Sequence, residues 1–223
     1  ELLLLSKSKP GSCIKSFWRN SMRKLCKALL SLVLVILLVW GGKSLLTTGF
    51  RFFQETLYPI RYEEIVGREA DRYHLDPALV YAVIRAESSF RPKAVSGKGA
   101  YGLMQITEET FEWLQTKMDE EESYTVEDLY RPEINIRYGC KLLSILLSQY
   151  SSTETALCAY NAGMGRVGEW LSDSAYSSDG VTLHTIPFPE TENYVSAVME
   201  NYSVYHELYQ FQLNGGVMHV EKK

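Results

Sequence analysis

The sequence lacks the cysteine and histidine spacings that mark metal and redox sites. Its 223 residues include four cysteines and four scattered histidines, with no CxxC pair and no Cys/His cluster. Four cysteines are also too few for a disulfide scaffold in a chain of this length. These absences exclude a zinc module and a thiol redox motif, and we expect no metal and no cofactor. Cys140 and Cys158 are interpreted as small buried hydrophobic residues, with a bridge between them as the alternative outside the cell.

Long runs of alternating apolar and polar residues are also lacking, as are internal repeats. From Tyr62 onward apolar residues recur at helical spacing, which predicts an all-α, mainly helical body. Helix starts are indicated by Asp76 before Pro77, by Thr107 and by Pro132. Glycines 163 and 165 are expected to interrupt a helix, residues 172–186 to form a loop, and residues 189–211 to form the last long helix. The tail after it is expected to be loose.

Positive charge is concentrated at one end of the chain. Residues 1–27 carry seven Lys and Arg against Glu1, a formal charge of +6, so the other 196 residues carry −10 within the total of −4. The run that follows, "ALLSLVLVILLVWGG", contains no charged side chain. With its flanks this run reaches the roughly 20 residues that a membrane-spanning helix needs. This arrangement argues against nucleic acid as a partner and predicts a single-pass anchor with a cytoplasmic N-terminus.

The resulting domain plan has a basic cytoplasmic tail, an anchor in the cytoplasmic membrane, a linker, an extracytoplasmic catalytic body and a short C-terminal tail. A cleaved signal peptide is the alternative to the anchor, but no A-x-A-like site follows the apolar run. The predicted boundaries are 1–27, 28–46, 47–61, 62–211 and 212–223.

One carboxylate stands out within the predicted helical body. Leu79, Val80, Val83, Ile84 and Glu87 share one helix face, so Glu87 faces the core or a cleft. Such a group is a partner in a buried ion pair, a metal ligand or a catalytic acid with a raised pKa. The residues around Glu87 alone do not choose between these roles.

Glu87 begins the first of four stretches that follow one another along the chain: "ESSF…GAYGLMQIT", "NIRYGCKLL", "ALCAYNAG" and "IPFPETENYV". Together they resemble the soluble lytic transglycosylase (SLT) domain of family 1 lytic transglycosylases over about residues 62–211. The resemblance implies a lysozyme-like fold and makes Glu87 the single catalytic acid and base. It also implies these substrate-contacting residues: Ser88, Ser96, Gly102, Leu103, Met104, Gln105, Tyr160, Asn161, Glu190 and Tyr194.

The activity implied by this resemblance is cleavage of the MurNAc–GlcNAc β-1,4 bond in peptidoglycan glycan strands without water, which leaves 1,6-anhydro-MurNAc ends. Glycoside hydrolysis usually needs two carboxylates. A goose-type lysozyme-like hydrolase is therefore the first alternative, with Asp173 and Asp179 as weak candidates for the second group. The other alternative is a catalytically silent wall-binding scaffold of an envelope machine.

Overall fold

The computed structural model describes residues 56–118 and 124–222, and before them only residues 22, 30–32, 34, 35, 37, 40, 41, 49, 50, 53 and 54. The chain divides into two compact units, residues 1–54 and 55–223, and the second is the body described below. The predicted anchor at 28–46 lies mostly outside the described residues. Within the part of the chain that is described, no helix has both the length and the apolar character that crossing a bilayer requires.

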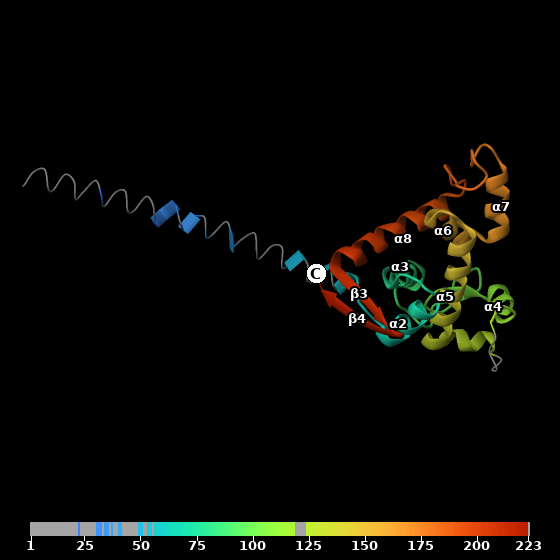
Figure 1. The fold of residues 1–223 in the computed structure, drawn as a ribbon, viewed down its shortest axis with the longest axis horizontal. Coiled ribbons are helices and arrows are strands. Elements are labelled where there is room, and N and C mark those ends of the chain that lie inside the picture. The colour runs from blue at the N-terminus through green and yellow to red at the C-terminus, as the bar shows by residue number, and fades with distance from the viewer. Residues whose placement is uncertain are drawn as a thin grey trace, which may run out of the picture. The chain divides into compact units, whose positions relative to one another are not determined.

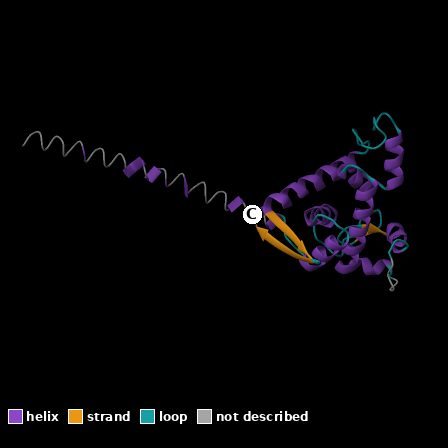
Figure 2. Ribbon diagram, viewed as in Figure 1, coloured by secondary structure: helices purple, strands orange, loops and turns teal. Residues whose placement is uncertain are grey.

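The body is mainly helical, as the sequence predicted, with two small antiparallel hairpins (Figure 2). In chain order its elements are α2 (Glu63–Arg72), α3 (Pro77–Ser88), β1 (Ala100–Tyr101), β2 (Ile106–Thr107), α4 (Glu108–Gln115), the 3₁₀ helix η1 (Val126–Tyr130), α5 (Pro132–Gln149), α6 (Thr153–Ala162), α7 (Met164–Ser172), α8 (Pro189–Leu208), β3 (Tyr209–Asn214) and β4 (Val217–Lys222).

Helix α3 forms the centre of the body, packed along α8 and against α2 (Figure 1). Seven successive residues of α3, from Ala78 to Ile84, are almost completely inaccessible to solvent. The predicted start signals are confirmed: Asp76 accepts a hydrogen bond from the Ala78 amide at 2.9 Å, and Thr107 accepts one from the Thr110 amide at 3.3 Å. Asp76 also joins α3 to α8, because Tyr202 Oη and His206 Nε2 each lie 2.8 Å from its other carboxylate oxygen.

The C-terminal segment differs from its prediction. Instead of a loose tail, β3 and β4 pair antiparallel through a two-residue Gly215–Gly216 turn, in which both residues have positive φ. That geometry is the one that two-residue hairpin turns require and that glycine adopts without strain. The hairpin packs on α2, where a Cβ on Gly67 would overlap Met218. Helix α8 accordingly ends at Leu208, three residues before its predicted end.

The segment just before α2 is joined to the same region of the body. The carbonyls of Leu57, Tyr58 and Pro59 accept hydrogen bonds from Arg85, Tyr209 and Tyr205, respectively. The Arg85 guanidinium also stacks over the Tyr58 ring, 4.0 Å from its centroid. Residues 57–59, which the sequence assigned to a linker, are therefore anchored on the folded body.

The cysteines and the break between α6 and α7 were also predicted from the sequence. Cys140 and Cys158 are free and buried, which confirms the interpretation as small core residues. The chain breaks between α6 and α7 at Gly163, whose φ is 88°, whereas Gly165 continues inside α7. One glycine with positive φ is thus enough to interrupt the helix, and the second adopts ordinary helical geometry.

Candidate active site

Glu87 lies in the last turn of α3, where the chain leaves the helix through an unusual backbone path. The next two positions, Ser89 and Phe90, both have left-handed conformations, with φ of 49° and 62°. Non-glycine residues rarely adopt this conformation, which costs about 1–2 kcal/mol for each. Phe90 is held by its burial against Tyr81. The helix therefore stops within two residues of the carboxylate and leads directly into the following loop.

The surroundings of Glu87 raise its affinity for a proton. Burial raises the pKa of the carboxyl group to about 7 from its ordinary value of 4.5, and the neighbouring Tyr194 hydroxyl lowers it in part. Burial has this effect because a desolvated carboxylate loses the water that stabilises its charge. A carboxyl group with such a pKa can both donate and accept a proton near neutral pH.

Two tyrosines border this carboxyl group, Tyr160 from α6 and Tyr194 from α8. Their rings lie nearly parallel with centroids 6.5 Å apart. Burial and the nearby Glu87 charge hold the pKa of both hydroxyls well above the ordinary value, so both stay protonated. Tyr160 Oη donates to the Met104 carbonyl at 2.8 Å. Tyr194 Oη is buried and makes no hydrogen bond of normal length to the described residues, but it lies close enough to Glu87 for each group to shift the pKa of the other.

The loop that follows α3 returns to the site through the β1–β2 hairpin. Its four connecting residues, 102–105, begin and end with positive φ, at Gly102 and Gln105. The side-chain Nε2 of Gln105 donates to the carbonyls of Gly102 and Ala94, at 2.8 and 3.2 Å. The predicted Gly-Leu-Met-Gln segment is thus a closed turn fixed by its own side chain.

Asn135 on α5 supports this turn from beneath. Its side-chain Oδ1 accepts a hydrogen bond from the backbone N–H of Met104 at 2.7 Å. Its Nδ2 donates to the carbonyls of Tyr101 and Leu129, at 2.8 and 2.9 Å. A Cβ on Gly102 would overlap Asn135 and the Leu129 carbonyl. Only glycine therefore fits this position, both for its positive φ and for the space available.

Ser96 lies in the loop that follows α3, and Glu190 lies in the first turn of α8. Ser96 Oγ accepts from the Ala100 and Lys98 amides at 3.1 and 3.3 Å, which leaves its own proton available to donate. Glu190 is exposed and pairs with Lys98 at 2.7 Å, joining the loop to the first turn of α8. Since Glu190 precedes Tyr194 by four residues, both lie on one face of α8.

The other predicted site residues have mainly structural contacts. Asn161 accepts from Thr191 Oγ1 at 2.8 Å and so links α6 to α8. Ser88 is buried and directs its hydroxyl to the Ile84 carbonyl at 3.2 Å. The Met104 and Leu103 side chains are fully buried, and Met104 packs against Gly139. These placements favour a supporting role for Ser88, Leu103 and the Met104 side chain over direct substrate contact.

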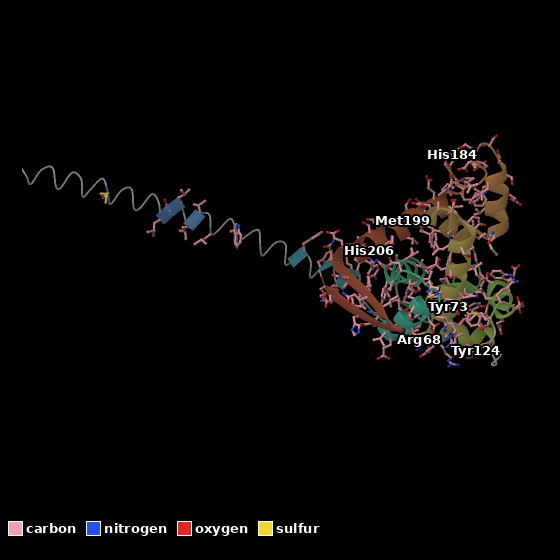
Figure 3. All side chains as sticks on the ribbon, in the orientation of Figure 1. Arg68, Tyr73, Tyr124, His184, Met199 and His206 are labelled. Carbon is pink, nitrogen blue, oxygen red and sulfur yellow. The ribbon has the colours of Figure 1, made fainter. Side chains whose placement is uncertain are left out.

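Among the described residues no three His, Cys, Asp or Glu side chains gather closely enough to hold a metal ion. The labelled histidines illustrate this, since His184 belongs to the loop beyond α7 and His206 to the end of α8 (Figure 3). Asp173 and Asp179 belong to the loop after α7 and satisfy its own backbone: Asp173 Oδ1 accepts from the Ala175 amide, and Asp179 accepts from the Val181 and Thr182 amides. These hydrogen bonds also hold the Asp179 pKa well below its usual range.

Comparison with known proteins places this site within a known family. Residues 64–180 match the family model of the transglycosylase SLT domain. A soluble lytic murein transglycosylase of Salmonella typhimurium is 33% identical over 160 residues, which cover 71% of this chain and 25% of that protein. The membrane-bound lytic murein transglycosylase C of Serratia proteamaculans is 33% identical over 134 residues, covering 54% of this chain and 36% of that protein.

Solved structures agree with the sequence comparison. An inactive Glu-to-Gln mutant of lytic transglycosylase Slt from Pseudomonas aeruginosa matches with a TM-score of 0.60 and 35% identity, over 68% of this chain and 25% of that chain. The 70-kDa soluble lytic transglycosylase in complex with bulgecin A matches with a TM-score of 0.61 and 29% identity, over 69% of this chain and 25% of that chain. This chain therefore spans only about a quarter of the length of these soluble relatives.

Proposed function

The chain belongs to the transglycosylase SLT domain family, and we propose that it is a lytic transglycosylase that cleaves the glycan strands of peptidoglycan. The observation that carries this proposal is the state of Glu87, whose pKa burial raises to about 7 between two protonated tyrosines. The names of the relatives, soluble and membrane-bound lytic murein transglycosylases, support the same substrate class.

The proposed reaction uses Glu87 twice. The protonated carboxyl group first donates its proton to the oxygen of the MurNAc–GlcNAc β-1,4 bond as the bond from C1 of MurNAc to that oxygen breaks. The resulting carboxylate then accepts the proton of the C6 hydroxyl of the same MurNAc as O6 bonds to C1. The products are a GlcNAc with a free 4-hydroxyl and a 1,6-anhydro-MurNAc end, and the carboxyl group is protonated again.

The tyrosines have a defined part in this cycle. Between the two proton transfers Glu87 is an anion in a desolvated site, where an unpaired charge is costly. Tyr194, as a neutral donor beside the carboxylate, stabilises that intermediate state. Tyr160 is committed to the Met104 carbonyl and so holds the 102–105 turn against the site.

The surroundings favour this reaction over hydrolysis. A hydrolase would need a second carboxylate to position water or act as nucleophile. The two candidates in the sequence, Asp173 and Asp179, are both occupied by the backbone of their own loop. A silent wall-binding scaffold remains the other alternative, and the presence of Glu87, Ser96, Gln105 and Tyr160 argues against it.

For its location, we propose the arrangement expected from the sequence: residues 28–46 as a membrane anchor, residues 1–27 in the cytoplasm, and the catalytic body outside the membrane. The basic residues before the apolar run support this orientation. The similarity to a relative named as membrane-bound is consistent with it.

Digestion of purified sacculi by the full-length protein tests the reaction. We expect soluble muropeptides with 1,6-anhydro ends by mass spectrometry, and no release by Glu87→Gln. Glu192 is an exposed carboxylate on α8, so Glu192→Gln serves as the control and should digest sacculi normally. Reducing ends that contain an added water would establish hydrolysis instead. A Glu87→Gln protein that still supports its cellular process would favour the scaffold.

A further inference from the structure

Helix α5 holds Met104, the third residue of the 102–105 turn, at two points. Asn135 accepts a hydrogen bond from the Met104 backbone N–H at 2.7 Å, and both residues are fully buried. Gly139, one helical turn further along α5, lies so close to the Met104 side chain that a Cβ there would overlap its sulfur and carbon atoms. Residues four apart lie on one face of a helix, so a single face of α5 fixes both the backbone and the side chain of Met104.

The carbonyl of Met104 is the hydrogen-bond acceptor for Tyr160 on α6. The Tyr160 hydroxyl has one proton, and it donates this proton to the Met104 carbonyl at 2.8 Å. The Glu87 carboxyl group is close enough for its charge to raise the pKa of the same hydroxyl. Within residues 56–118 and 124–222, the Tyr160 hydroxyl thus lies near two acceptors and donates to the neutral one.

The choice of acceptor matters for a carboxyl group that must carry a proton. An O–H group that donates to a carboxylate stabilises the ionised form and lowers the pKa of the acid. Tyr194 on α8 already lowers the pKa of Glu87 in part. A second donor, from Tyr160, would lower it further and leave less of the acid protonated at neutral pH. In the described part of the chain, the other titratable group that acts on Tyr160 is Cys140 on α5, and both Cys140 and Tyr194 stay neutral.

We propose that Asn135 and Gly139 are positioning residues for the reaction. By holding Met104 in place, they keep the Tyr160 hydroxyl away from the Glu87 carboxyl group. The inference rests on the proposed function, since it concerns the protonation of the same catalytic acid. Both residues are buried parts of α5 and act on that acid through Met104 and Tyr160.

Two variants of the full-length protein release Met104, and a third is their control. Asn135→Ala removes the acceptor for the Met104 backbone, and Gly139→Ala adds a methyl group that displaces the Met104 side chain. Gly67→Ala in α2 is matched to the second variant, because its methyl group would overlap another methionine, Met218. That overlap belongs to the contact between α2 and β4, which includes neither tyrosine beside Glu87.

The first measurement is kcat/KM on sacculi as a function of pH. We expect both α5 variants to move the alkaline limb of the profile to lower pH by about one pH unit, because the freed Tyr160 hydroxyl donates to the Glu87 carboxylate. In the Tyr160→Phe background no hydroxyl can turn toward the acid, so the same two substitutions should leave the limb in place. Gly67→Ala should leave it in place in both backgrounds, which separates positioning from a general loss of stability.

The second measurement needs no activity. The difference in urea unfolding between proteins with and without Glu87→Gln, followed as a function of pH, reports the proton affinity of Glu87. In both α5 variants this pH dependence should also move to lower pH, and again only when Tyr160 is present. Should Asn135→Ala fail to fold, Gly139→Ala decides alone, since it removes no hydrogen-bonding group.

The outcomes separate this inference from the proposed function. If sacculi are digested and neither measurement moves in the α5 variants, the positioning role is wrong and the activity stands. If both measurements move equally in the Tyr160→Phe background, the turn excludes water from Glu87 and the role given to the tyrosine is overturned. If no protein digests sacculi but the unfolding measurement moves in a Tyr160-dependent manner, the proposed function fails and the positioning role stands.

Discussion

Replacing Glu87 with glutamine is expected to stabilise the folded protein at neutral pH while it removes the proposed catalytic acid. The pKa of Glu87 rises from 4.5 to about 7 on folding. Between these values the unfolded chain has released a proton that the folded chain retains, so stability falls as pH rises. The contribution of Glu87 to the free energy of unfolding is fully present below pH 4.5 and is lost by about pH 7. At about 1.4 kcal/mol for each pKa unit, the loss is about 3 kcal/mol.

Urea unfolding at pH 4 and pH 8 measures this effect. The advantage of Glu87→Gln over the parent protein should grow by about 3 kcal/mol between the two pH values, because packing differences that do not depend on pH cancel in the comparison. Glu192→Gln on α8 is the control, since it removes a carboxylate that is exposed. An advantage that stays constant, or that shrinks toward pH 8, would refute the assignment of Glu87 as a buried, proton-retaining acid.

Three other changes have expected outcomes that follow from single contacts. Tyr194→Phe removes a donor that lowers the Glu87 pKa, so the alkaline limb of the pH–rate profile should move upward by about one pH unit; a downward move would contradict this. Gly102→Ala should lower the free energy of unfolding by about 3 kcal/mol, since the methyl overlaps Asn135 and the residue has positive φ; wild-type stability in thermal unfolding would contradict it. Asp76→Ala should lose about 2–4 kcal/mol in urea unfolding, because it removes the α3 cap and two side-chain hydrogen bonds from α8. A loss of less than 1 kcal/mol would show that those contacts are replaced by water.

The helices were predictable because their signals are local. Asp76 before Pro77 marks the start of α3, and the apolar spacing after it places Glu87 on the inner face. The hairpin was missed although its signal is present: Tyr209, Phe211 and Leu213 alternate with polar residues and precede a Gly-Gly pair. The apolar residues of this short segment also continue the helical pattern that precedes it, so the sequence alone allows either a helix or a strand. The packing of the hairpin on α2 favours the strand.

The site was predictable in part. The motifs named Glu87, Tyr160 and Tyr194, which the structure brings close together. They did not indicate the support that Asn135 gives to the 102–105 turn. That support depends on α5 meeting a loop 31 residues away, and a single asparagine in an apolar helix does not specify its partner.

The contacts of residues 57–59 with Arg85, Tyr205 and Tyr209 also set the maximum length of the segment that would join the proposed membrane anchor to the body. If the anchor ends at residue 46, only residues 47–56 remain to span the distance to the first fixed contact. Ten residues in a fully extended chain cover at most about 35 Å. The first fixed contact would therefore stay within that distance of the membrane surface. The tether, together with the dimensions of the body, would limit the depth of the wall at which glycan is cleaved.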